Sequence, residues 1–204
     1  EPAKDIYNTV KRWRDTCLIG EQSVFSDESL WNRKGFDDLV QHYVNNLDEG
    51  EGDFFSKLEG QLSSAPKSAI KLAAEVFWLL YLYPAPQAMT ASTKLHQIKN
   101  IWGWTGETLP EGNEEKINVL DGGIGHPGTA YNTLRWREFM WIVLAMDNWF
   151  GKSKDERQNF LSEPWEFAKW LDSTPQSKAR QFRHILLHLL FPDTFERIST
   201  GSHK

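Results

Sequence analysis

Near the end of the chain, residues 177–198 read SKARQFRHILLHLLFPDTFERI, and this stretch constrains the fold more than any other. Five apolar residues recur there at the i, i+3, i+4, i+7, i+8 spacing of one helix face: Phe182, Ile185, Leu186, Leu189 and Leu190. Because such a stripe has to be buried, the stretch is predicted to be a core helix. Pro192 should end it. Asp193, followed three residues later by Glu196, predicts a second short helix that carries Phe195.

Helical spacing recurs along the rest of the chain, and no stretch alternates at the period of two that is typical of a strand. The most hydrophobic segment, residues 69–83, stands between Pro66 and Pro84 and is predicted to be a central helix. Other apolar stripes predict helices around residues 6–18, 36–47, 54–62, 92–104, 133–150 and 164–171. The sequence therefore predicts an all-α, aromatic-rich domain of about eight to ten helices.

Aromatic residues are unusually abundant. The 204 residues include ten Trp and twelve Phe, more than one core of this size requires. Some of these rings are therefore expected to face outward or to line a groove. The chain is long enough for one good core, so residues 1–204 are predicted to form one domain. If that domain has two lobes, their boundary is expected near residues 105–130.

Cysteine usage and hydropathy bear on the compartment. The single Cys17 excludes a disulfide within the chain and a metal site built from several cysteines, which fits a reducing cytoplasm. No apolar run reaches the roughly 18 residues that a membrane-spanning helix needs. We therefore expect a cytoplasmic protein with no membrane partner. Because the chain begins without Met and stops at Lys204 with no clear ending, we also expect it to be a piece of a longer protein.

Helical periodicity disappears from Gly103 to Gly128, which predicts a long Gly-rich loop. Glycines let a backbone approach a ligand, aromatic rings can stack on a base, and Asn or Arg can read its hydrogen-bonding edge. The candidate ligand-binding residues on either side of the loop are Trp102, Trp104, His126, Thr129, Tyr131, Asn132 and Arg135. The alternative, which we favour, is a structural turn in which Asn132 is the N-cap of the next helix.

A basic cluster near the end of the chain is a second candidate for ligand binding. Residues 177–204 contain five basic and two acidic side chains, a local charge of +3 on a chain of net charge −5. The basic residues are Lys178, Arg180, Arg183, Arg197 and Lys204. Arg180 and Arg183 would contact phosphates if the cluster binds nucleic acid, but a solvated helix face explains the same charges. The negative net charge argues against nucleic-acid binding by the whole surface.

Three features raise the question of catalysis or metal binding. His184 and His188 lie one helical turn apart, as paired zinc ligands do, but Ile185 stands where the zincin pattern requires Glu, and no third ligand is evident. Glu75 lies in the most apolar segment without a visible partner for general-base chemistry. No His in the sequence stands in a recognisable catalytic Cys–His pattern with Cys17. We therefore predict no catalytic residue, no metal and no cofactor, and a free-standing enzyme is the least favoured class.

Two stretches resemble a known family. The segment His184–Ile198 is similar to a segment that precedes the motor domain of McrB-type AAA+ NTPases, the NTP-driven subunits of modification-dependent restriction systems. The segment Gly123–Asn132 resembles a Gly-rich turn in the same N-terminal region, and the two matches cover about an eighth of the chain. Neither is a catalytic signature. The sequence has no G-x-x-x-x-G-K-[ST] phosphate loop, so the motor itself is not part of it.

The resemblance implies a non-catalytic target-recognition domain. In McrB-type systems the N-terminal region selects modified DNA, while the motor and a separate nuclease do the work. The expected partners are therefore modified DNA, an AAA+ motor in the same parent chain and a partner nuclease, in restriction or antiviral defence. The alternative is a protein-interaction or regulatory module that docks on the motor or the nuclease. A DNA reader should gather basic residues around the Gly-rich loop, whereas a docking module should expose an apolar patch.

Overall fold

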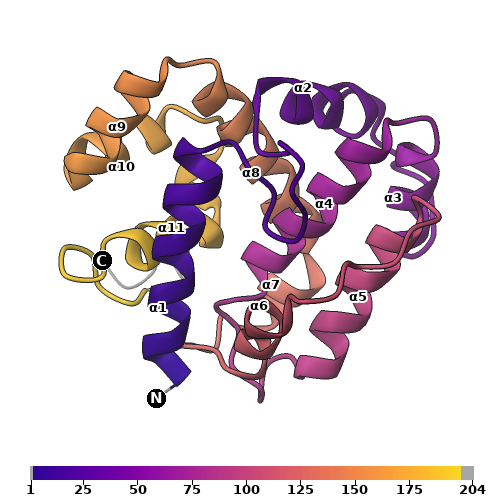
Figure 1. Cartoon of the computed structure of the whole chain (residues 1–204), viewed down its shortest axis with the longest axis horizontal. Coiled ribbons are helices and arrows are strands. Elements are labelled where there is room, and N and C mark those ends of the chain that lie inside the picture. Colours follow the sequence, from indigo (N-terminus) through magenta and orange to yellow (C-terminus); the bar gives the residue numbers. More distant parts are fainter. Residues whose placement is uncertain (1, 199–204) are drawn as a thin grey trace.

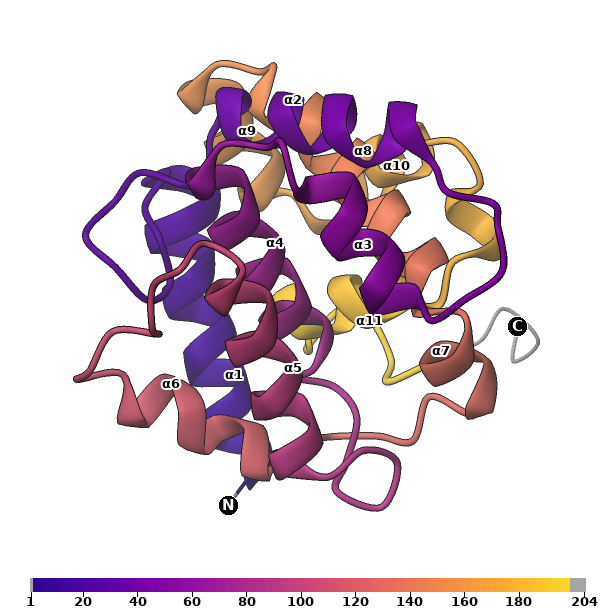
Figure 2. The same ribbon diagram turned by 90° about the vertical axis from the view of Figure 1, so that its right-hand side faces the viewer.

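The computed structural model describes residues 2–198, and this part of the chain is helical (Figures 1 and 2). It contains eleven α-helices, one π-helical turn and three 3₁₀ turns, and its only β-type pairing is an isolated bridge between Pro84 and Gly125. The prediction of an all-α domain is confirmed. Two five-residue helices in and beside the Gly-rich region bring the number of helices above the eight to ten expected.

The helices follow one another with short connections. In chain order they are α1 (Pro2–Trp13), the π-helical turn η1 (Arg14–Ile19), α2 (Arg33–His42), η2 (Val44–Asn46), α3 (Phe54–Leu62), α4 (Lys67–Leu80), α5 (Ala91–Gly103), α6 (Glu114–Asn118), η3 (Val119–Asp121), α7 (Thr129–Thr133), α8 (Arg135–Phe150), α9 (Lys154–Ser162), α10 (Pro164–Asp172), η4 (Ser177–Ala179) and α11 (Gln181–Leu190).

Helix α4 is the central helix, as its sequence predicts. Every residue from Ala69 to Leu80 is buried, because the helix has no polar face to turn toward solvent. It packs against α2, α5 and α8, and Figure 2 shows α5 running alongside it. Stacked rings of Phe77 and Phe139, 4.6 Å between centroids, join α4 to α8. Helix α8 in turn contacts α11, so it connects the α2–α5 group to the C-terminal helices.

Helix α11 buries the whole predicted stripe and packs against α1, α8 and α10. The predicted core helix is therefore confirmed. The prediction of a second short helix after Pro192 is wrong, because residues 191–198 form a turn and no helix. Thr194 and Phe195 donate backbone hydrogen bonds of 3.0 Å to the Phe191 carbonyl, and the rings of Phe191 and Phe195 contact each other at 6.2 Å between centroids. These contacts hold the chain in a turn. Lys204 of the basic cluster lies outside the described residues.

Truncating the buried stripe of α11 should destabilise the domain. Leu186→Ala removes methyl groups from a fully buried position and is expected to lower the free energy of unfolding by about 2–5 kcal/mol. Leu47→Ala is the control, because Leu47 is 43% exposed and its truncation should cost well under 1 kcal/mol. Urea denaturation measures both. If Leu186→Ala is as neutral as the control, α11 is not a core helix.

The Gly-rich region is a strap packed against the α4–α5 connection. Helix α6 and turn η3 occupy residues 114–121 within it, so the prediction of one continuous irregular loop is wrong. Backbone hydrogen bonds from Ile124 to Tyr83 (3.0 Å) and from Ala85 to Gly125 (2.8 Å) fix its last part. A Cβ atom at Gly123 would clash with the Pro84–Ala85 backbone, so glycine is required there for close packing within the protein.

A buried ammonium group also holds the strap. The side chain of Lys94, on α5, is completely buried, and its Nζ donates to the carbonyls of Pro84 (2.6 Å), Leu120 (3.0 Å) and Gly122 (3.0 Å). Pro84 belongs to the α4–α5 connection, Leu120 to η3, and Gly122 directly follows η3. Lys94 therefore joins the strap to the central helices from inside the protein.

Candidate functional site

The aromatic residues predicted to stack on a ligand are mostly buried. Trp102 is in the core, where it contacts Phe25 edge-to-face and lies 5.4 Å beneath the Lys71 ammonium. Tyr131 is equally buried, and its hydroxyl donates to the Leu80 carbonyl at 2.8 Å. The prediction that these rings stack on a base is therefore wrong for this conformation, because packing across the fold covers them. Trp104 is half-buried against the same core.

Three other predicted residues lie outside any cavity. His126 and Thr129 are exposed, and His126 Nδ1 only accepts a local hydrogen bond from the Gly128 backbone at 3.2 Å. Arg183 is engaged by Asp172, with two nitrogen–oxygen distances of 2.9 and 3.0 Å. The geometry therefore does not support the prediction that Arg183 contacts a phosphate, because its guanidinium is already paired with the Asp172 carboxylate.

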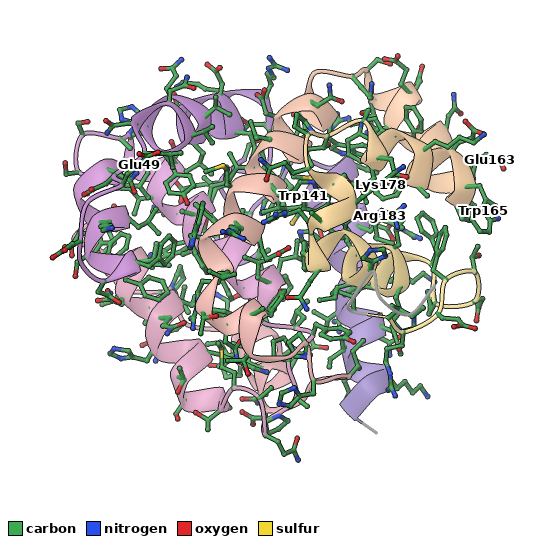
Figure 3. The ribbon with its side chains drawn as sticks, turned by 180° about the vertical axis from the view of Figure 1, so that it is seen from behind. Glu49, Trp141, Glu163, Trp165, Lys178 and Arg183 are labelled. Carbon is green, nitrogen blue, oxygen red and sulfur yellow. The ribbon has the colours of Figure 1, made fainter. Side chains whose placement is uncertain are left out.

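The remaining predicted residues, Asn132, Arg135 and Arg180, line one groove with a volume of about 1240 Å³. Its walls come from residues 47–61 on one side and from α7, α8 and the segment before α11 on the other. Figure 3 views this part of the molecule, with Glu49 on one side of it and Trp141 near the middle. We call it the α8 groove. It brings together residues that are distant in sequence.

Charge is divided across the α8 groove. Four cations line it, Lys57, Arg135, Arg137 and Arg180, together with three carboxylates, Asp48, Glu49 and Asp53. The three carboxylates all belong to the exposed 48–53 segment, whereas the three arginines belong to the opposite wall. Lys57 donates to the Gly50 carbonyl and so closes the acidic segment. The groove thus has an acidic side and a basic side.

Arg135 is held rigidly on the basic wall. Its guanidinium donates to the Asn132 carbonyl (2.8 Å), to Gln97 Oε1 (2.8 Å) and to the Tyr81 hydroxyl (3.1 Å), and it lies 5.6 Å above the Phe55 ring. Burial raises the pKa of Tyr81 to about 12, so this hydroxyl stays protonated. Arg137, two residues further along α8, is exposed and lies over the Trp136 ring at 5.1 Å from its centroid. Arg135 therefore shapes the wall, and Arg137 is accessible.

Arg180 is a buried cation without a hydrogen-bond acceptor among the described residues. Its residue is 8% exposed, and its Nε lacks a partner. Arg180 acts electrostatically on the Glu138 carboxylate, which accepts from the backbone N–H groups of Gln181 (3.3 Å) and Phe182 (2.9 Å) at the start of α11. Burial raises the pKa of Glu138, while these N–H groups and Arg180 act against that rise.

Two further polar atoms of the groove lining are unpaired. Trp141 is only 2% exposed, and its buried indole N–H has no acceptor among the described residues. Asn132 uses its amide nitrogen on the Ala88 carbonyl at 2.9 Å and leaves Oδ1 unpaired. Buried polar groups are nearly always hydrogen-bonded, so unpaired atoms that line a groove indicate where a ligand can bind. Trp13 and Trp102 also carry unpaired N–H groups, but neither lines this groove.

The features considered for catalysis have structural roles instead. Glu75 is completely buried and accepts hydrogen bonds from Ser23 Oγ, Trp31 Nε1 and two backbone N–H groups. Both ring nitrogens of His188 are engaged, by the Tyr7 hydroxyl at 2.7 Å and the Phe195 carbonyl at 2.8 Å. His188 is therefore buried and unavailable as a ligand. Within residues 2–198 no group of three His, Cys, Asp or Glu side chains is arranged to hold a metal.

Comparison with protein-family models, with curated proteins and with solved structures finds no match to this chain. Among the described residues, no helix combines the length and apolar character needed to cross a membrane.

Proposed function

We propose that this domain is a non-catalytic recognition module that binds nucleic acid at the α8 groove. The observation that carries the proposal is Arg180, a groove-lining residue that is 8% exposed and whose buried Nε has no hydrogen-bond acceptor among the described residues. A largely buried cation without an ion-pair partner favours a bound anion. The accessible Arg137–Trp136 pair adds a phosphate contact and a stacking surface on the same wall.

The local resemblance to McrB-type N-terminal regions supports the same proposal. In that context the domain would select modified DNA for an AAA+ motor in the same parent chain and a partner nuclease, in restriction or antiviral defence within the cytoplasm. The basic residues gather at the α8 groove and not at the Gly-rich strap, so the proposed contact residues agree only in part with those predicted. The groove carries four cations and three carboxylates, which favours a local contact over a long basic track.

A fluorescence titration of the domain with modified and unmodified duplexes at two salt concentrations tests this proposal. Arg137→Gln should lower the slope of log K against log salt by about one unit, because one phosphate contact is lost. Trp136→Ala should weaken binding by about 1–3 kcal/mol and leave the slope unchanged, because stacking is insensitive to salt. Lys99→Gln is the control, since Lys99 is exposed on α5 and outside the groove. Absence of binding at low salt would contradict the proposal.

The second candidate function is a protein-docking module, and one observation favours it. Trp165 on α10 is 64% exposed, and its ring contacts Phe195 edge-to-face at 4.9 Å between centroids (Figure 3). An exposed indole supported by a second ring is typical of a residue that anchors a protein interface. If duplexes fail to bind at low salt, this aromatic pair becomes the better candidate for the site of recognition.

A further inference from the structure

The unpaired groups of the α8 groove specify the chemistry of what binds there. Arg180 and Trp141 offer only N–H donors, so the partner missing from this end of the groove must be an acceptor. Because Arg180 carries a positive charge and forms no ion pair among the described residues, the acceptor should be an anion. We propose that Arg180 and Trp141 form a subsite for a terminal phosphate group, at the end of an oligonucleotide or on a mononucleotide. This inference rests on the proposed function for the class of ligand.

Arg180 and Trp141 lie at the same junction between α8 and α11. Glu138 and Trp141 are three residues apart and so share one face of α8. Glu138 accepts the backbone N–H groups of Gln181 and Phe182, and Trp141 contacts the Phe182 ring at 6.5 Å between centroids. Arg180 directly precedes this pair and acts electrostatically on the Glu138 carboxylate. Both residues therefore line the groove close to the point where α11 begins.

The net charge at this junction is positive, which favours binding of an anion. Two arginines, Arg180 and Arg137, act on the single carboxylate of Glu138, which leaves an excess of one positive charge. Glu138 is engaged by two backbone N–H groups and forms no ion pair with either arginine within the described residues. An added phosphate would therefore meet two cations and one indole N–H donor.

Burial selects a terminal phosphate over an internal one. The two donors belong to residues that are 8% and 2% exposed, so a ligand must insert a protruding group to reach them. An internal phosphodiester carries a sugar on each side and runs along a surface, whereas a terminal phosphate projects from the end of the chain. The terminal group also carries up to two negative charges. It therefore matches both the depth and the charge of this end of the groove.

The rest of the groove lining also offers hydrogen-bond acceptors. Asn132 leaves an unpaired acceptor oxygen, and the opposite wall carries the carboxylates of the 48–53 segment. Arg135, which fixes Asn132 through its carbonyl, is six residues from Trp141, or about 9 Å along α8. A nucleotide presents a phosphate at one end and amino or hydroxyl donors at the other. The phosphate would meet Arg180 and Trp141 at one end of the groove, and the amino or hydroxyl donors would meet Asn132 and the carboxylates further along it.

Isothermal titration with three probes tests the subsite: one short single-stranded oligonucleotide with a 5′-phosphate, the same oligonucleotide with a 5′-hydroxyl, and the corresponding mononucleotide. The phosphorylated oligonucleotide should bind at least about tenfold tighter than the hydroxyl form. Trp141→Phe keeps the ring and removes only the N–H donor, so it should reduce this preference about five- to tenfold and leave the hydroxyl form unaffected. Trp13→Phe is the matched control, because its indole N–H is also buried and unpaired but lies outside this groove, and thermal melting of each variant checks folding.

The outcomes separate the subsite from the proposed function. Binding of the mononucleotide but of neither oligonucleotide would support the subsite and contradict nucleic-acid recognition. Equal binding of the phosphorylated and hydroxyl oligonucleotides would overturn the subsite and leave nucleic-acid recognition standing. A preference for the phosphate that survives Trp141→Phe would also overturn the subsite as assigned. Arg180→Lys is a second variant, and it should weaken the phosphorylated form because lysine cannot present the Nε–H donor.

Discussion

Replacing Glu75 by leucine is expected to prevent stable folding of the domain. The Glu75 carboxylate accepts hydrogen bonds from Ser23 Oγ, from the backbone N–H groups of Val24 (2.8 Å) and Phe25 (3.1 Å), and from Trp31 Nε1 (2.7 Å). Leucine would leave these four donors buried without an acceptor. At about 1–3 kcal/mol for each unpaired donor, the loss is about 4–12 kcal/mol. A domain of this size is stable by only about 5–15 kcal/mol.

Glu75→Gln should give an intermediate result. Each carboxylate oxygen accepts from two of the four donors, so glutamine keeps one acceptor and turns an NH₂ group toward the other two donors. We expect a loss of about 2–6 kcal/mol for this variant. Glu59→Gln is the matched control, because Glu59 is exposed on α3, and it should change stability by less than about 0.5 kcal/mol. Urea denaturation that shows Glu75→Gln to be equally neutral would exclude this carboxylate as the anchor of residues 23–31.

The second large effect is expected for Lys94→Met, which should release the Gly-rich strap. The variant leaves the carbonyls of Pro84, Leu120 and Gly122 buried without a donor. Part of this loss is offset because a buried charge is also removed, so we expect a net cost of about 3–6 kcal/mol. Hydrogen exchange should accelerate at residues 120–125 before the rest of the domain opens. Lys99→Met, an exposed position on the same helix, should change neither quantity.

The effect of Lys94 should also depend on pH. Burial, opposed by Asp121, lowers the pKa of Lys94 from 10.5 to about 8 in the folded protein. Between these two values the unfolded chain binds more protons at this residue than the folded protein, so the Lys94 contribution to stability increases as pH rises. The stability difference between wild type and Lys94→Met should therefore grow by about 2 kcal/mol from about pH 8 to pH 10. If the stability difference between wild type and Lys94→Met shrinks over this pH range, Lys94 keeps its proton in the folded protein.

Local apolar periodicity predicted the main helices correctly because it depends only on residues that are close in sequence. The stripe of α11 and the apolar run of α4 are buried as expected. Asn132 was not the N-cap predicted: it lies inside α7, and Leu134 separates α7 from α8. Its amide instead reaches the Ala88 carbonyl across the fold. That partner is distant in sequence, so no local pattern could indicate it.

The site was predicted only in part for a similar physical reason. Arg180 and Arg135 were selected for their charge and do line the groove, whereas Trp102 and Tyr131 were selected as aromatic neighbours of glycines and are buried. Trp141 was missed. Its ring occupies an ordinary position on α8, and the absence of an acceptor for its N–H depends on packing against α11. The one signal in the sequence is the residue type, since tryptophan is a large, mainly apolar side chain that carries an indole N–H donor.

The most direct test of the α8 groove as the ligand site is the indole N–H resonance of Trp141 in ¹⁵N-labelled protein. The resonance is assigned by its loss in Trp141→Phe. Because this N–H lacks an acceptor in the free protein, a 5′-phosphorylated oligonucleotide should shift it downfield as a hydrogen bond forms. The Trp149 indole, which already donates to the Leu18 carbonyl at 3.1 Å, should keep its position. A Trp141 resonance that stays in place while the oligonucleotide binds elsewhere would contradict the account.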